Sequence, residues 1–161
     1  MWVRSEYAGE FAVVATWLSA IMPWSVTIIH EGELTAFFFW FVPGNVLFTP
    51  GTELPGDRPF WVWQYPSFFE SSGEVLVSYL WLLGAALLFL AVAYSLLYYV
   101  DESRVERWPM SPVRILGSLL LVSALALAAA YIALVRSHAG TSIPLGVLFQ
   151  FVFGVVLLRI K

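Results

Sequence analysis

Apolar residues along the chain gather in four long runs, which polar or irregular stretches separate. The runs cover residues 11–29, 75–100, 113–135 and 143–158. An α-helix rises about 1.5 Å per residue, so about 20 apolar residues cross a hydrocarbon core of about 30 Å. The pattern therefore predicts an all-α membrane protein, a four-transmembrane-helix bundle forming one domain over residues 1–161, with an outer cap over residues 30–74.

Residues at the ends of the runs carry helix-boundary signals. Ser111 and Pro112 fit the N-cap and the first helical position before the third run. Ser71 and Glu74 have the spacing of a capping box before the second run. Pro23 lies inside the first run, where we expect it to kink the helix.

The stretch between the first two runs is unusually aromatic for a loop. The segments "TAFFFWFV" and "VLF" flank Pro43-Gly44-Asn45, a turn signal, and "FWVWQY" follows. This pattern fits a small β element, or a re-entrant or interfacial segment. A fifth span fits less well, because Pro43-Gly44 interrupts it. We expect a folded outer cap that lies partly in the membrane interface.

Composition indicates that the bilayer is the solvent of this chain. The chain is 60% hydrophobic and 12% charged, whereas an average soluble domain has about 25% charged residues. It has no Cys, which excludes disulfides, thiolate metal sites and Cys nucleophiles. The net charge of −3 gives no basic surface for nucleic acid.

The distribution of Lys and Arg predicts the orientation. If both termini and the loop after the second run share one side, that side holds most of the basic residues. It would carry Arg4, Arg104, Arg107, Arg114, Arg159 and Lys161, and the other side Arg58 and Arg136. The positive-inside rule then predicts a multi-pass protein of the cell membrane with both termini in the cytoplasm.

Aromatic side chains of the cap are the main binding candidates. Phe39, Trp40, Phe41, Trp61 and Trp63 could form a docking face for a partner or an apolar ligand. The alternative is an aromatic belt that only anchors the cap at the lipid–water interface, where Trp and Tyr are enriched.

The four apolar runs offer little polar chemistry. Gln150 is the only strongly polar side chain in the middle of a run, and we expect it to hydrogen-bond a neighbouring helix or, less simply, to bind a ligand. Pumps and charge-coupled carriers usually need intramembrane charge. The chain has no phosphate-binding loop, HExxH or GxSxG motif, so we predict no catalytic residues, no cofactor and no enzyme activity.

One cluster could hold a metal ion on the outer side. His30, Glu31, Glu33 and His138 offer nitrogen and oxygen ligands. Their spacing matches no known ligand signature, so the simpler interpretation is four solvated interfacial residues and no metal site.

The opening "WVRSEYAGEFAVVATWLSA…PWSV", the few spans, the absence of Cys and the single Lys complete the pattern. In these features the chain resembles the small multi-pass membrane proteins of haloarchaea. The resemblance implies no activity and no site residues, because these families have no established activity.

These observations favour a non-catalytic integral membrane protein. We expect an accessory or assembly subunit, or a small homo-oligomer, that presents its cap to another membrane protein or to itself among membrane lipids. The alternative is a binding module for a lipid, quinone or carotenoid between the spans. A small transporter or channel lined by Gln150 and serines is a weaker alternative.

Overall fold

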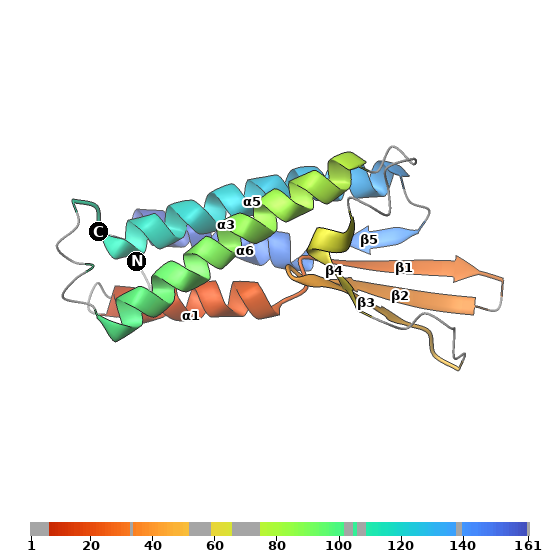
Figure 1. The fold of residues 1–161 in the computed structure, drawn as a ribbon, viewed down its shortest axis with the longest axis horizontal. Helices are drawn as coiled ribbons and strands as arrows, with labels where there is room; N and C mark the ends of the chain where they lie inside the picture. The colour runs from red at the N-terminus through yellow and green to blue at the C-terminus, as the bar shows by residue number, and fades with distance from the viewer. Residues whose placement is uncertain are drawn as a thin grey trace.

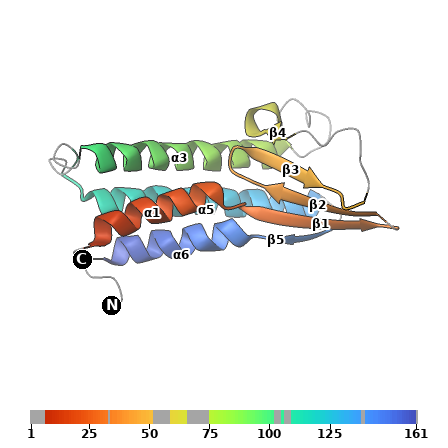
Figure 2. The same cartoon turned by 90° about the horizontal axis from the view of Figure 1, so that it is seen from below.

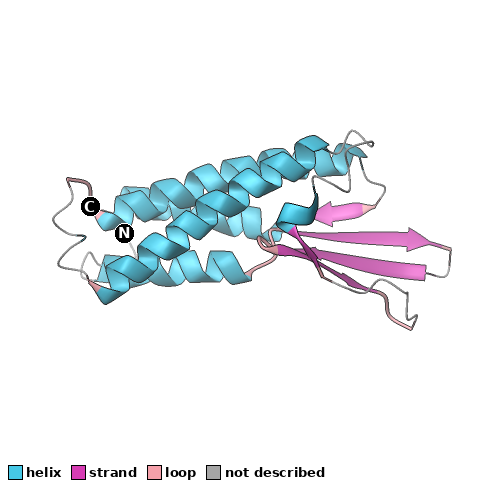
Figure 3. Ribbon diagram, viewed as in Figure 1, coloured by secondary structure: helices cyan, strands magenta, loops and turns pink. Residues whose placement is uncertain are grey.

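Four helices lie side by side, and a five-stranded antiparallel sheet extends from one end of them (Figure 1, Figure 3). The computed structural model describes residues 7–32, 34–51, 59–65, 75–101, 105, 109–137 and 140–160. The helices are α1 (Ala8–Ile21), α3 (Val75–Val100), α5 (Pro112–Ser137) and α6 (Leu145–Arg159), with a short 3-10 helix η2 (Val62–Gln64). The strands are β1 (Ser25–Glu31), β2 (Leu34–Trp40), β3 (Gly44–Phe48), β4 (Phe60–Trp61) and β5 (Thr141–Ile143).

The predicted all-α fold class is wrong. The chain forms a sheet in the order β4-β3-β2-β1-β5 beside its helices. Among the described residues, only α3 and α5 are long and apolar enough to cross a membrane, while α1 and α6 are apolar but shorter. The described residues therefore form a mixed α and β fold, and not a four-transmembrane-helix bundle.

The first apolar run contains a helix and a strand, because Pro23 ends the helix instead of kinking it. Proline cannot donate a backbone hydrogen bond, and it pushes the preceding residue into an extended conformation. Met22 accordingly has φ −74° and ψ 136°, and α1 ends at Ile21. The residues that follow, "SVTII", are rich in β-branched side chains, which favour strands.

The fourth run is divided in the same way. Ile143, the expected start of a span, is the last residue of β5, and Pro144 precedes the first residue of α6. The sheet therefore begins earlier than the predicted cap, at Ser25, and takes one strand from the far end of the chain.

Other parts of the prediction agree with the structure. The second run coincides with α3, and α5 begins at Pro112 as its cap signal indicates. Within the aromatic loop the β interpretation is correct, since β2 and β3 form a hairpin across Pro43 and Phe60 begins β4.

The sheet lies along the long axis of the molecule, beyond the ends of α1 and α6 (Figure 2). Strand β1 pairs with β2 on one side and with β5 on the other. One sheet face carries Trp40 and packs against α3 through Trp81. The opposite face carries Phe39 and Val46, which pair in register and are not buried.

The four helices pack through small residues and apolar side chains. Leu88, Leu116, Leu120 and Leu127 are fully buried between them. Helices α5 and α6 approach closely where Gly154 faces Gly117: a Cβ added at Gly154 would lie 3.0 Å from the Leu121 amide nitrogen.

We expect Gly154→Val to lower the free energy of unfolding by about 1–3 kcal/mol, because added methyl groups at a close helix contact force the backbones apart. Val152 on the same helix is exposed, so Val152→Leu is the matched control and should change stability by less than about 0.5 kcal/mol. Unfolding of the purified protein in detergent micelles measures both. Equal stability of the two variants would contradict the close α5–α6 approach.

Candidate functional site: an aromatic junction and an exposed tryptophan pair

Four aromatic side chains meet where the sheet joins the helices. Trp24, Trp40, Tyr65 and Trp81 are all buried, and we call this cluster the aromatic junction. The centroid of the Trp40 ring lies 5.9 Å from Trp24, 5.4 Å from Trp81 and 5.6 Å from Tyr65. Tyr65 also meets Trp81 at 4.8 Å, edge to face. Such pairs each contribute about 0.5–1.5 kcal/mol beyond their burial, so the cluster fixes the sheet to α3.

The chain reaches this junction from four separate elements. Trp24 follows the proline that ends α1, and Trp40 is the last residue of β2. Tyr65 follows η2, and Trp81 lies in the second turn of α3. The junction therefore joins the helices to three different parts of the sheet region.

Hydrogen bonds fix the polar atoms of the junction. The Trp40 indole N–H donates to Thr27 Oγ1 at 3.1 Å, and Thr27 Oγ1 lies 2.8 Å from Ser142 Oγ of β5. The Trp81 indole N–H donates to the Phe41 carbonyl at 3.2 Å, in the turn between β2 and β3. One hydroxyl of β1 thus links β2 to β5.

The start of α6 is capped by the link between α1 and β1. The Gly146 amide donates to the Pro23 carbonyl at 3.0 Å, and the Val147 amide to the Trp24 carbonyl at 3.4 Å. A Cβ at Gly146 would lie 2.6 Å from the Pro23 oxygen and 2.8 Å from Trp24 Cα. Only glycine allows this approach, which satisfies amides that a helix start otherwise leaves unpaired.

Three buried polar atoms near Trp40 have no hydrogen-bond partner among the described residues. They are the Trp24 indole nitrogen, Ser25 Oγ and Asn45 Oδ1. Ser25 and Asn45 are the register partners of Trp40 on β1 and β3. The Asn45 amide nitrogen, in contrast, donates to Tyr65 Oη at 2.8 Å.

Two other tryptophans are exposed at the edge of the sheet. Trp61 and Trp63 stack with ring centroids 5.2 Å apart and an interplanar angle of 3°. They are 43% and 59% exposed. The short 3-10 helix holds them, since the Trp61 amide donates to Gln64 Oε1 and the Val62 amide to the Pro43 carbonyl.

The structure separates the binding candidates that the sequence grouped together. Trp40 is only 3% exposed and belongs to the junction. Phe41 is half-buried, and its backbone carbonyl, rather than its ring, bonds to α3. Phe39 lies on the opposite sheet face and is half-buried. Trp61 and Trp63 are the candidates that an external partner can reach.

Gln150 lies away from the aromatic residues, in the middle of the helices. It is 0% exposed. Ser123 of α5 shares its one hydroxyl proton between the Gly84 carbonyl of α3, at 2.9 Å, and the Gln150 side-chain oxygen, at 3.3 Å. The expectation that Gln150 bonds a neighbouring helix is confirmed. Its amide nitrogen has no partner among the described residues.

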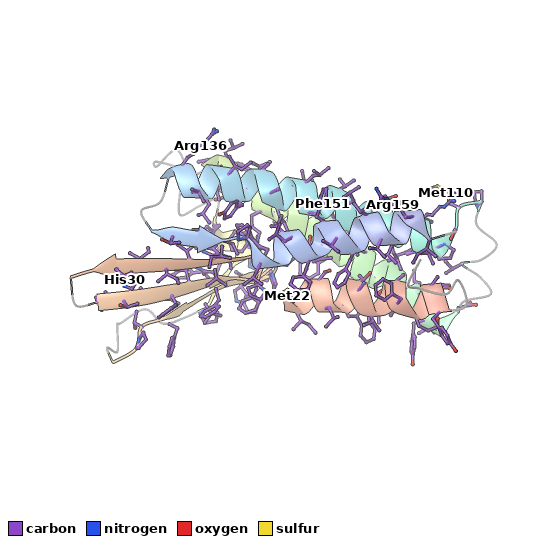
Figure 4. The ribbon with its side chains drawn as sticks, turned by 180° about the vertical axis from the view of Figure 1, so that it is seen from behind. Met22, His30, Met110, Arg136, Phe151 and Arg159 are labelled. Atoms are coloured by element: carbon purple, nitrogen blue, oxygen red, sulfur yellow. The ribbon has the colours of Figure 1, made fainter. Side chains whose placement is uncertain are left out.

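The metal candidates are only partly described. His30 is the second-last residue of β1 (Figure 4), and its Nδ1 lies 3.0 Å from Thr35 Oγ1. Glu33, His138 and the side chain of Glu31 lie outside the described residues. Among the residues that the structure describes, no three His, Asp or Glu side chains could hold a metal ion together.

The sequence analysis missed the junction partners Trp24, Thr27, Tyr65 and Trp81. Trp24, Thr27 and Trp81 lay in predicted spans and Tyr65 in a predicted strand, so no sequence pattern indicated that they meet. The available signal was Pro23 followed by β-branched residues, which indicates that Trp24 starts a strand region rather than continuing a helix.

A family model matches residues 1–161, the whole chain. The chain belongs to DUF7549, a family of unknown function. A comparison with curated proteins gave no match to the chain. For this DUF7549 chain, function must therefore be inferred from the aromatic junction and the Trp61–Trp63 pair. The junction carries no carboxylate, imidazole or amine, and what it offers is aromatic packing and hydrogen bonding.

We expect Thr27→Val to lower the free energy of unfolding by about 1–3 kcal/mol, because it removes the hydroxyl that accepts the hydrogen bond of the buried Trp40 indole N–H. Ser25→Ala, one row away on the same strand, removes a hydroxyl without a described partner and should be neutral or slightly stabilising. Denaturant titration of both variants in one detergent tests the pair. A loss at Ser25 as large as that at Thr27 would contradict this assignment of roles.

Proposed function

We propose that the chain is a non-catalytic, multi-pass integral membrane protein that acts as an accessory subunit. In this proposal, the Trp61–Trp63 pair binds a partner polypeptide at the outer membrane surface. The observation that carries the proposal is the exposed, parallel stack of these two indoles on a sheet that the aromatic junction fixes to the helices.

Membrane embedding is supported by what the helices expose. Helices α3 and α5 are long and apolar enough to cross, and Phe151 of α6 is exposed midway between the ends of the helices (Figure 4). Arg114 and Arg136 lie near the two ends of α5. The start of α1 and the end of α6 lie at the end opposite the sheet (Figure 1). The excess of Lys and Arg in the sequence near both termini and after the second apolar run supports cytoplasmic termini.

The chemistry of the pair favours a basic and apolar partner segment. Tryptophan is enriched among residues that dominate binding energy, and an indole face attracts guanidinium or ammonium groups. The sequence on either side of the pair adds negative charge. It carries Glu53, Asp57, Glu70 and Glu74 against Arg58.

Rigidity of the sheet strengthens this proposal. Binding costs less when the contacting side chains are already held in place. The two indoles stack on each other, and the hydrogen bonds from Trp61 and Val62 fix the backbone that carries them. A partner would therefore meet a preformed surface.

Site-specific photocrosslinking in native membranes tests the proposal. A benzoylphenylalanine in place of Trp63 should crosslink to one defined polypeptide carrying basic residues at the contact, and Trp61→Ala should reduce this product at least tenfold, a loss of about 1.4 kcal/mol. The control places the same probe at Phe89, an exposed residue in the middle of α3, where the product should be absent.

Only lipid or self-crosslinks at position 63, unchanged by Trp61→Ala, would contradict the subunit role. One stoichiometric quinone, carotenoid or lipid extracted from the pure protein would instead favour the small-molecule alternative. Neither outcome depends on the fold, so the experiment tests the function alone.

A further inference from the structure

We propose that the uncovered face of the sheet is a lipid-binding surface, embedded in the outer leaflet of the bilayer. There the sheet completes the crossing of the outer leaflet, because α1 and α6 are too short to span the hydrocarbon alone. This inference rests on the proposed membrane embedding but concerns different residues from the Trp61–Trp63 pair. Its ligand class is the acyl chains and glycerol region of membrane lipids.

The uncovered face is ordered in rows by the strand register. The row nearest the helices contains Val26, Phe39, Val46 and Ile143, and the next contains Ile28, Phe37, Phe48 and Thr141. The third row contains His30 and Thr35. None of these side chains is buried. The face thus changes from apolar to polar with distance from the helices, which is the gradient that a lipid–water boundary requires.

The lengths of the elements agree with this placement. Helix α1 has 14 residues and α6 has 15, which correspond to about 21 and 22 Å. A hydrocarbon core is about 30 Å thick, so each helix falls short by about 8 Å. Two sheet rows and the links to them cover about that distance, since a strand rises about 3.4 Å per residue.

Residues on the two long helices mark the same boundaries. Tyr79 and Tyr99 of α3 are both exposed and lie about 30 Å apart along the helix, the spacing of two interfacial aromatic belts. Tyr79 is two residues from Trp81, whose indole contacts the base of the sheet. Trp81 follows Tyr79 toward the middle of α3 by about 3 Å, so the base of the sheet lies on the hydrocarbon side of the outer belt.

Helix α5 gives an independent depth marker. The Tyr131 hydroxyl donates to the Ser142 carbonyl of β5 at 2.9 Å. Tyr131 precedes Arg136 by about 7.5 Å of helix, and Arg136 is exposed at the sheet end of α5 (Figure 4). Ser142 lies between the first two rows, so these rows are on the membrane side of this arginine.

A sheet can enter a bilayer only where its edges are hydrogen-bonded, because unpaired backbone groups are costly in lipid. At the β5 edge the Tyr131 hydroxyl binds the Ser142 carbonyl. At the β4 edge the amide of Trp61 is bound by Gln64 Oε1, and that of Val62 by the Pro43 carbonyl. The β5 edge is therefore bonded between the first two rows, and the β4 edge beside Gly44 and Asn45, just on the helix side of the first row.

Continuity of surface favours lipid over a protein as the occupant. Exposed side chains of α1 and α6, such as Leu18, Ile21 and Leu148, are apolar and lead toward the first row without a charged residue. A second copy of the chain is the alternative occupant, and the following experiment recognises it.

Spin labels in lipid nanodiscs test the inference, because a chain without Cys allows single-cysteine variants. The exposed positions are Val46→Cys and Phe48→Cys in the first two rows and His30→Cys in the third. Val152→Cys of α6 is the lipid reference and Met110→Cys the water reference; both are exposed. We expect the ratio of oxygen to nickel-chelate accessibility to be several-fold higher at positions 46 and 48 than at position 30, and close to that at position 152.

Each of the other outcomes contradicts one part of the inference. Nickel accessibility at 46 and 48 equal to that at 30, with position 152 still in lipid, would overturn the lipid-binding sheet and leave the membrane embedding intact. Low accessibility to both reagents, or spin–spin broadening, would show a second copy on the face. Water accessibility at position 152 as well would overturn the embedding itself.

Discussion

The structure depends on how backbone hydrogen bonds are completed where two of its four helices stop. Pro23 follows the end of α1, and Pro144 precedes the start of α6. Neither proline can donate a backbone hydrogen bond, so neither can continue a helix. The two ends are bonded to each other: the carbonyl of Pro23 accepts a hydrogen bond from the first turn of α6, and β1 pairs with β5. The sheet is thus the means by which two interrupted helices keep their polar backbone groups bonded.

The aromatic junction connects this hydrogen-bonded region, where the sheet meets the helices, rigidly to α3. Large rings from α3, from two strand ends and from the segment after η2 interlock, so the sheet cannot move without separating several of them. Removing one of these buried rings would create a cavity. For Trp40, Tyr65 or Trp81 it would also break a hydrogen bond. Features at the sheet edge therefore keep a fixed position relative to the helices.

Sequence patterns predicted the elements that one dominant signal controls. An uninterrupted apolar run gave α3, and a cap followed by proline gave the start of α5. Apolar content alone, however, does not distinguish a buried helix from a strand, so residues 25–29 were assigned to a helix although their β-branched side chains favour a strand. The junction as a whole could not be predicted, because its members meet through the pairing of β1 with β2 and through packing between distant elements.

The pairing of β1 with β5 also has a consequence for how the chain is made. Residues 26–28 pair with residues 141–143, so more than 110 residues must be synthesised before this ladder can close. Until then one edge of β1 has no paired strand, and the hydrogen bond from the Gly146 amide to the Pro23 carbonyl cannot form. Contacts so distant in sequence form late and slowly. Ribosome-bound chains that end before β5 should therefore be the form most exposed to quality-control proteases, even though all of the first three helices are already present.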